Sequence, residues 1–191
     1  MSTKTLNVLF ARMNPPTVAH ETLIATMADR GEDFRIFLSE TVNLENPLPV
    51  DIRKSIISEC HPEYADKIDS ARDLFIAMDK ADAYMKEHGM TNIELWFGSD
   101  RLPAFERVLL YPDRWSFKVT GLNQLNRTSD VSATAVRAAA VNNDTTTYNR
   151  MAMGTPSIQG RLFDDLRERL TNGTASLEGK TKTSKRRSNR L

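Results

Sequence analysis

The chain has 191 residues, of which 40% are apolar and 27% charged, an ordinary composition for one globular α/β domain. No apolar run approaches the length of a membrane span, and the N-terminal residues lack the pattern of a signal peptide, so we expect neither. The single cysteine, Cys60, excludes an internal disulfide and argues against a cysteine-based zinc site. These features favour a reducing compartment, and we expect a cytoplasmic protein without membrane contact.

The net charge of +1 conceals an uneven distribution. Of the 26 basic residues, six lie within residues 180–191, which hold no acidic residue. Residues 1–179 therefore carry 20 basic against 25 acidic side chains, a net charge of −5. We expect a mildly acidic domain over residues 1–170 and a flexible basic tail over residues 171–191, where apolar residues are few.

Short apolar runs and helical periodicity alternate along the chain. In chain order we predict a strand at 5–10, a helix at about 20–30, a strand at 34–38, helices at 50–59 and 72–87, a strand at 93–97, a helix at 103–110, a strand at 116–120, and helices at 133–141, 145–152 and 160–170. Alternating strands and helices indicate βαβ units. The expected fold is α/β, a doubly wound, Rossmann-like parallel sheet with C-terminal helices.

The first candidate site is the loop after the first predicted strand. It runs from Ala11 through two prolines to His20 and leads into a helix. Ligands of open α/β sheets bind beyond the C-terminal strand ends, and a helix start there favours phosphate. His20 and Thr17 lie one helical turn apart, so both can face that edge. The competing interpretation is that His20 only caps or packs against its helix.

The second candidate site precedes an alanine-rich helix at residues 131–137. Ser132 is a good N-cap, Thr134 falls in the first turn, and Arg137 follows one turn later. A capped helix start with a hydroxyl and a guanidinium suits an anion. Taken alone, the pattern also fits a surface helix with a solvated arginine.

Together, these segments resemble the nucleotidyltransferase α/β-phosphodiesterase superfamily. The sequence Asn14-Pro15-Pro16-Thr17-Val18-Ala19-His20 is similar to its Asn-Pro-Pro-(His/Thr)-x-Gly-His signature, and residues 131–137 resemble its Ile-Ser-(Ser/Gly)-Thr-x-x-Arg signature. Gly98-Ser99-Asp100 resembles the Gly-Ser-Asp after the family's fourth strand. Asn46-Pro47-Leu48-Pro49, followed by Arg53, resembles a segment of nicotinamide-mononucleotide adenylyltransferases and related phage-encoded proteins. The resemblance covers residues 4–142 and looks most like the phage-encoded branch, which would place the protein in a host cytoplasm or a virion.

The resemblance implies nucleotidyl transfer: an acceptor oxygen attacks the α-phosphorus of a nucleoside triphosphate, and pyrophosphate leaves. ATP is the expected donor and CTP the second choice, with nicotinamide mononucleotide as the first acceptor. Mg²⁺ would arrive with the triphosphate, without a protein metal site. The implied catalytic residues are His20, Thr17 and Arg137; the implied nucleotide and phosphate contacts are Arg12, Met13, Asn14, Ser132, Thr134, Gly98, Asp100 and Arg101; and the implied acceptor contacts are Asn46 and Arg53.

Some positions depart from the family pattern. Alanine replaces glycine at residues 11 and 19, and Ala133 replaces serine or glycine, where a close approach of the backbone to phosphate favours glycine. Glu45 stands where lysines are common and would repel a triphosphate if it pointed inward. A second hypothesis therefore remains: a catalytically degenerate fold that serves as a nucleotide-binding or assembly protein, for example in a phage particle.

The basic tail predicts a partner of the opposite charge. Residues 180–191 are expected to contact nucleic acid or an acidic partner surface, although a solubilising role explains the same charges. A homo-oligomer is also possible from the sequence.

Overall fold

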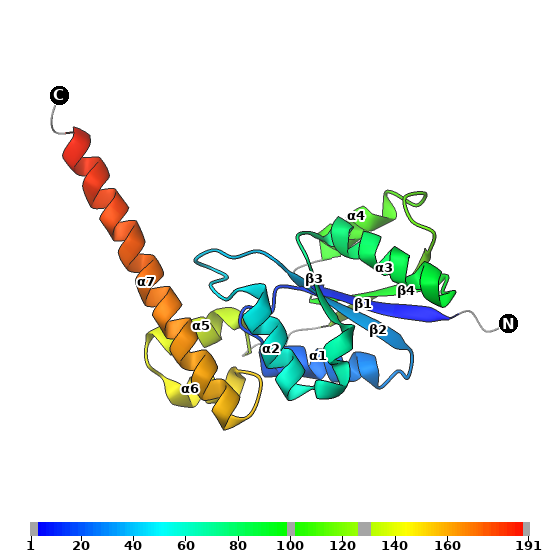
Figure 1. The fold of residues 1–191 in the computed structure, drawn as a ribbon, viewed down its shortest axis with the longest axis horizontal. Coiled ribbons are helices and arrows are strands. Elements are labelled where there is room, and N and C mark those ends of the chain that lie inside the picture. The colour runs from blue at the N-terminus through cyan, green and yellow to red at the C-terminus, as the bar shows by residue number, and fades with distance from the viewer. Residues whose placement is uncertain (1–3, 99–101, 126–130, 189–191) are drawn as a thin grey trace.

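The computed structural model describes residues 4–98, 102–125 and 131–188. Its five strands form one sheet in the spatial order β3-β2-β1-β4-β5, and every neighbouring pair is parallel (Figure 1). Their bounds are Thr5–Ala11 for β1, Asp33–Ser39 for β2, Ile68–Ala71 for β3, Asn92–Gly98 for β4 and Lys118–Leu125 for β5. The chain therefore builds outward from β1 to β3, then returns to the other side of β1. That reversal is the place where open α/β sheets bind ligands.

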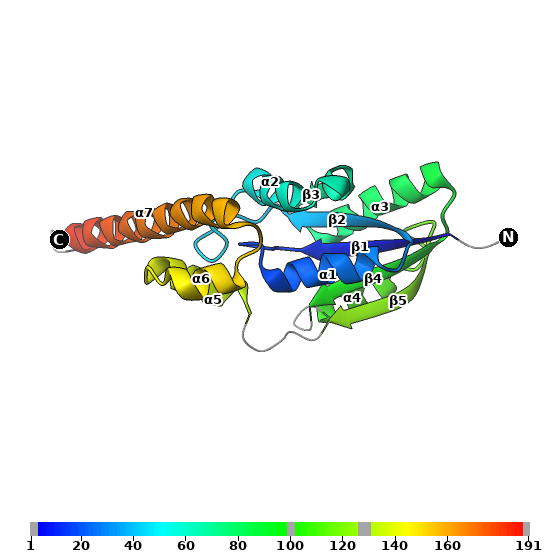
Figure 2. The same cartoon turned by 90° about the horizontal axis from the view of Figure 1, so that it is seen from below.

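Four of the helices cover the two faces of the sheet. Helices α1 (Val18–Ala28) and α2 (Val50–Cys60) pack on one face, whereas α3 (Leu74–His88) and α4 (Leu102–Leu109) pack on the other (Figure 2). Each face of the sheet carries a hydrophobic core, and alternate residues of β1 contribute to the two. Val8 packs in the core on the α3 side and Leu9 in the core on the α1 side. The structure thus confirms the predicted doubly wound α/β fold.

The last three helices form a third core, to which Ile56 of α2 and Leu48 of the segment before that helix also contribute. Helices α5 (Ala133–Val141), α6 (Thr145–Met151) and α7 (Pro156–Ser188) enclose buried side chains that include Tyr148 and Leu166. This core meets the sheet domain next to the first candidate loop, where Thr17 and Ala152 form an isolated antiparallel bridge. The amide of Met153 also donates to the carbonyl of Pro16 at 3.3 Å.

Local signals explain where the α3 helix begins and ends. The Asp73 carboxylate accepts from the amide of Ile76 at 3.0 Å and caps the first turn. Gly89 ends the helix with a φ of 65°, a left-handed conformation that glycine adopts without strain.

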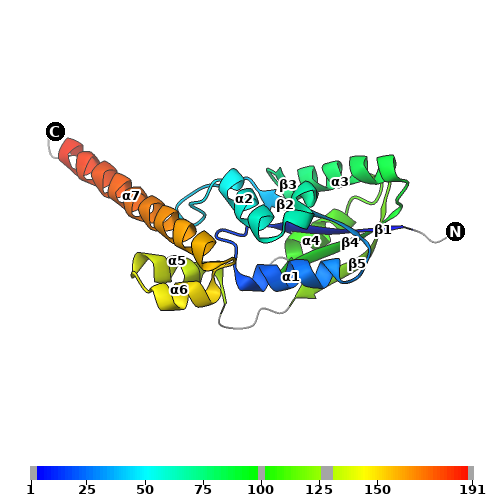
Figure 3. The same ribbon diagram turned by 60° about the horizontal axis from the view of Figure 1, so that its bottom comes forward.

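Several elements differ from the sequence-based expectation. Residues 62–67 form a short 3₁₀ helix and residues 68–71 form β3, neither of which was predicted, because a four-residue edge strand with Asp69 and Ser70 at its centre carries no apolar run. Helix α7 begins at Pro156 and continues to Ser188, past the predicted end at residue 170, and it projects from the body (Figure 3). The division of the chain at residue 170 stays a prediction. None of the helices in the described residues is long and apolar enough to cross a bilayer.

Candidate functional site

A cavity of about 640 Å³ opens at the C-terminal end of β1, beside the end of β4. It brings together the two candidate sites that the sequence separates. Among the predicted residues, those that line it are Arg12, Met13, Asn14, Thr17, His20, Asn46, Gly98, Ser132, Thr134 and Arg137. This volume lies within the range typical of small-molecule sites.

The first wall is the turn from β1 into α1. Thr17 is the N-cap of α1, and its backbone N–H donates to Nδ1 of His20 at 3.1 Å. The Thr17 hydroxyl lies 2.8 Å from the same nitrogen. Because Nδ1 accepts the backbone proton, the proton of a neutral His20 ring resides on Nε2. The ring is thereby oriented, with the proton of its neutral form on the second nitrogen.

The second wall is the start of α5. The Ser132 hydroxyl accepts from the amide of Ala135 at 3.1 Å, which confirms the predicted N-cap. Arg137 donates from Nη2 to the Thr134 hydroxyl at 3.1 Å and from Nη1 to the Asn14 carbonyl at 2.6 Å. The guanidinium therefore joins α5 to the first loop across the cavity. The alternative interpretation of residues 131–137, a surface helix with a solvated arginine, does not describe this arrangement.

The electrostatics of this wall suit an anion. Burial lowers the pKa of Arg137, and the positive charge of Arg12 lowers it further, while Glu45 acts in the opposite direction. Two guanidinium groups thus face one cavity whose borders include the N-termini of α1 and α5. Helix N-termini carry a partial positive charge and unpaired N–H groups, which bind phosphate.

The third wall is the segment between β2 and α2. A tight turn joins Asn43 and Asn46, whose backbones exchange hydrogen bonds of 3.1 and 3.0 Å. This turn carries the exposed Glu45 to the cavity. Farther along, Leu48 pairs with the side chain of Asn14: the amide Nδ2 donates to the Leu48 carbonyl at 2.9 Å, and the Leu48 amide donates back at 3.1 Å.

Among the described residues, one predicted contact does not lie in the cavity wall. Arg53 is fully buried beneath the loops and donates to backbone carbonyls, so the expectation that it contacts an acceptor was wrong for this structure. Its position explains the error: α2 turns Arg53 to the same face as the buried Ile56 and Ile57, three and four residues later. Asp100 and Arg101 lie outside the described residues.

Sequence reasoning also missed part of the wall. Thr22 and Leu23 line the cavity at positions that the two signatures do not mark, and Val131 lines it at the first position of the second signature, to which no contact was assigned. Thr22 and Leu23 follow His20 within the next turn of α1, which is the only signal that points to them. The three alanines at the glycine positions of the signatures, Ala11, Ala19 and Ala133, line the cavity as well.

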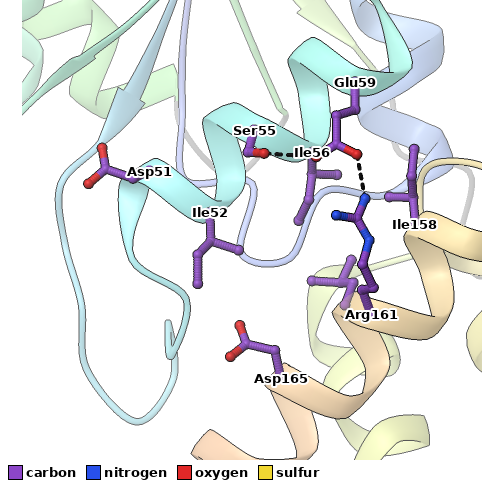
Figure 4. A pocket seen from close by; sticks show the side chains of 9 residues that line it. Asp51, Ile52, Ser55, Ile56, Glu59, Ile158, Arg161 and Asp165 are labelled. Carbon is purple, nitrogen blue, oxygen red and sulfur yellow. Dashed lines mark hydrogen bonds and ion pairs between the residues drawn. The ribbon is translucent and has the colours of Figure 1, made fainter.

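A second cavity, of about 410 Å³, lies between α2 and α7 (Figure 4). Its floor is apolar, and Glu59 of α2 pairs with Arg161 of α7 at its edge, with Ser55 donating to Glu59. None of the residues of the two signatures lines it. Within the described residues, no group of three or more His, Cys, Asp and Glu side chains is arranged to hold a metal ion.

Comparisons with solved structures give the same fold as adenylyltransferases. A protein assigned as a nicotinate-nucleotide adenylyltransferase of Vibrio parahaemolyticus aligns over 88% of this chain and 98% of its own, with a TM-score of 0.59 and 16% identity. The Plasmodium falciparum nicotinic acid mononucleotide adenylyltransferase in complex with NaAD aligns over 84% of this chain and 95% of its own, with a TM-score of 0.61 and 12% identity. The same enzyme in complex with APC gives a TM-score of 0.57 at 10% identity, over 84% and 98% of the two chains.

At these identities the likeness establishes the fold alone, a Rossmann-like α/β fold that these solved structures share with the chain. No protein-family model matches the chain, and no curated protein does. The expectation of a phage-encoded branch finds no support in these comparisons and stays a prediction.

Proposed function

We propose that the chain is a nucleotidyltransferase that moves the nucleoside monophosphate of ATP to a phosphorylated acceptor such as nicotinamide or nicotinate mononucleotide, with release of pyrophosphate. The observation that carries the proposal is the convergence of His20, from α1, and Arg137, from α5, on one cavity at the C-terminal edge of the sheet. The shared fold with the two nicotinate-type adenylyltransferases supports this choice of acceptor.

The reaction itself demands little covalent chemistry from the protein. An oxygen of the acceptor phosphate attacks the α-phosphorus, the bond from that phosphorus to the bridging oxygen breaks, and pyrophosphate leaves with its electron pair. Negative charge shifts onto the phosphate oxygens during this step, so donors fixed in advance lower the barrier. The Nε2–H of His20 and the guanidinium of Arg137 are such donors.

The donor set also fits Mg²⁺ that arrives with the triphosphate. Glu45 is the acidic side chain among the described residues of the cavity wall, and Mg²⁺ at such sites is held by one or two carboxylates together with substrate phosphates. A bound Mg²⁺ would neutralise charge on the leaving pyrophosphate. Arg12, Arg137 and His20 would hold the remaining phosphate oxygens.

The test is a pyrophosphate-release screen of ATP, CTP, GTP and UTP, each alone and with nicotinamide mononucleotide, nicotinate mononucleotide or a small phosphorylated alcohol. We expect release only when ATP and a pyridine mononucleotide are both present, with a dinucleotide product identified by its mass. Release with CTP and the phosphorylated alcohol would move the assignment to cytidylyl transfer. Tight triphosphate binding without release for any pair would contradict the proposal and favour a degenerate nucleotide-binding module.

A further inference from the structure

Arg53 is the largest side chain that the structure buries completely, with an exposed fraction of 0%. Burial lowers its pKa to about 10, so the guanidinium still carries its charge at neutral pH. A buried charge is costly unless hydrogen bonds replace the lost water. In the described part of the chain, those bonds come from backbone carbonyl oxygens and not from a carboxylate.

The carbonyls that Arg53 binds lie where two strands of the sheet separate. The pairing of β1 and β2 ends at Ala11 and Leu38, so Arg12 and Ser39 are the first residues beyond the ladder. Nη1 of Arg53 donates to the carbonyl of Arg12 at 2.5 Å, and Nη2 donates to that of Ser39 at 2.8 Å. One planar guanidinium thus binds a carbonyl of each strand just beyond the end of the pairing between β1 and β2.

The same guanidinium also fixes the segment that precedes α2. Its Nε donates to the carbonyls of Leu48 and Pro49 at 3.1 and 3.3 Å. Leu48 in turn exchanges two hydrogen bonds with the side chain of Asn14. Arg53 therefore constrains the Arg12–Asn14 backbone both directly and through Leu48.

This backbone segment has an unusual conformation. Met13 has a φ of 45° and is 1% exposed, in a left-handed conformation that a non-glycine residue adopts only when its surroundings hold it. The carbonyls on either side of Met13 are both engaged by guanidinium groups, that of Arg12 by Arg53 and that of Asn14 by Arg137. A free carbonyl oxygen at this edge would repel a phosphate, and these two are neutralised.

We propose that Arg53 is a positioning residue: it holds the Arg12–Asn14 backbone in the conformation that binds polyphosphate, without touching the ligand itself. This inference deepens the proposed function, since it needs only that the cavity binds a polyphosphate. It requires neither a particular base nor a particular acceptor.

The first test compares Arg53→Lys with the wild-type chain in two measurements. Lysine keeps the charge but cannot direct planar donors to Arg12, Ser39 and Leu48 at once. We expect hydrogen exchange in the free protein to accelerate at least tenfold in peptides that cover residues 11–17, with peptides from α3 unchanged. We also expect tripolyphosphate, measured by calorimetry, to bind at least tenfold more weakly, while unfolding stays cooperative.

Arg161→Lys is the matched control. Arg161 is an exposed arginine whose partner is Glu59, outside the candidate cavity, so its substitution should leave both measurements at wild-type values.

Chemical rescue covers the case in which Arg53→Lys fails to fold. Arg53→Ala leaves a space the size of the guanidinium group, and millimolar guanidinium ion should restore tripolyphosphate binding, whereas equal ionic strength of sodium chloride should not. A side chain that only filled the core would not be replaced by this ion.

The outcomes separate this inference from the proposed function. The inference is overturned if Arg53→Lys shows wild-type hydrogen exchange and wild-type affinity, or if its exchange increases evenly over the whole chain. It is also overturned if guanidinium ion fails to rescue an unfolded variant, or if the wild-type chain does not bind tripolyphosphate. Wild-type binding of tripolyphosphate that Arg53→Lys weakens, without pyrophosphate release for any substrate pair, would uphold the inference while the proposed function fails.

Discussion

The chemistry of His20 follows from one backbone hydrogen bond. The N–H of Thr17 donates to Nδ1, so the start of α1 itself orients the imidazole ring. This hydrogen bond also selects the tautomer, and no carboxylate is needed to do so. Because the sequence places Thr17 and His20 three residues apart at a helix N-terminus, this arrangement is a local consequence of the chain and not of distant packing.

We therefore predict that His20→Ala lowers the rate of pyrophosphate release by about 10²–10³-fold, the usual cost of one transition-state donor. Triphosphate affinity should fall much less, because Arg12 and Arg137 remain. Single-turnover kinetics beside calorimetry separates the two effects. His88→Ala is the control, since His88 is exposed at the end of α3 and outside the cavity. A variant that turns over at the wild-type rate would remove His20 from the chemistry.

The positions of the other site residues were predictable to different degrees. Arg12, Asn14, Ser132 and Arg137 could be placed at one edge because each adjoins a strand end or a helix start in the sequence, and such ends meet at one edge of a parallel sheet. The role of Arg53 could not be predicted in this way. Its spacing to Ile56 and Ile57 marks a buried helix face, but a sequence does not show that backbone carbonyls will satisfy a guanidinium there.

At the scale of elements, the mostly apolar runs were sufficient to predict three of the strands. The strands at 5–10, 34–38 and 93–97 lie within β1, β2 and β4, because each is largely buried and is mostly apolar in sequence. Each is interrupted by a single interior polar residue, which is Asn7, Arg35 or Glu94. The edge strand β3 was missed because only its pairing with β2 makes it a strand. The packing of the α5–α7 unit against the first loop was equally invisible, since it depends on contacts between Pro16 and Met153 that no local pattern encodes.

Two glycines of this C-terminal unit should respond in opposite directions to the same substitution. Gly154 connects α6 to α7 with a φ of 103°, and an added Cβ would lie 2.9 Å from Cγ2 of Ile158 and 3.1 Å from Sγ of Cys60. Gly154→Ala should lower the free energy of unfolding by about 2 kcal/mol or more. Gly160 lies within α7 with nothing within 4 Å of the added Cβ, so Gly160→Ala should raise it by about 0.5–1 kcal/mol.

Urea denaturation of both variants checks this pair. Equal stability of Gly154→Ala and the wild-type chain would show that the connection relaxes easily, and would argue against a fixed attachment of α7 to α2. Loss of stability in Gly160→Ala would indicate that α7 packs differently around that residue.

At the scale of the whole molecule, two hydrophobic cores stabilise the sheet and a third stabilises the C-terminal helices. The two cores on the faces of the sheet fix the strand ends, and the third core holds the start of α5 against them. The candidate cavity lies where these units meet, so its geometry depends on both. Polar contacts across that junction include the hydrogen bond from Arg137 to Asn14 and the bridge between Thr17 and Ala152.

The C-terminal tail differs from the rest of the chain in the sign of its charge. Residues 1–179 carry a net charge of −5, whereas residues 180–191 hold six basic and no acidic residues. Exposed ion pairs contribute only about 0–1 kcal/mol each, so docking of the tail on its own body should be weak. A nucleic acid offers more, because each neutralised phosphate releases counterions.

We accordingly predict that truncation after Gly179 leaves the rate of pyrophosphate release unchanged and weakens binding to a single-stranded oligonucleotide. With six cations removed, the slope of log K against log salt should fall in magnitude by up to about 4, since each phosphate that a cation neutralises on a single strand accounts for roughly 0.7 of that slope. A full-length variant with glutamine at the six basic positions should behave like the truncation, which distinguishes charge from chain length. Fluorescence anisotropy over a salt series measures the slope. Unchanged oligonucleotide affinity would show that the tail does not bind nucleic acid, and loss of turnover on truncation would place the tail within the active site.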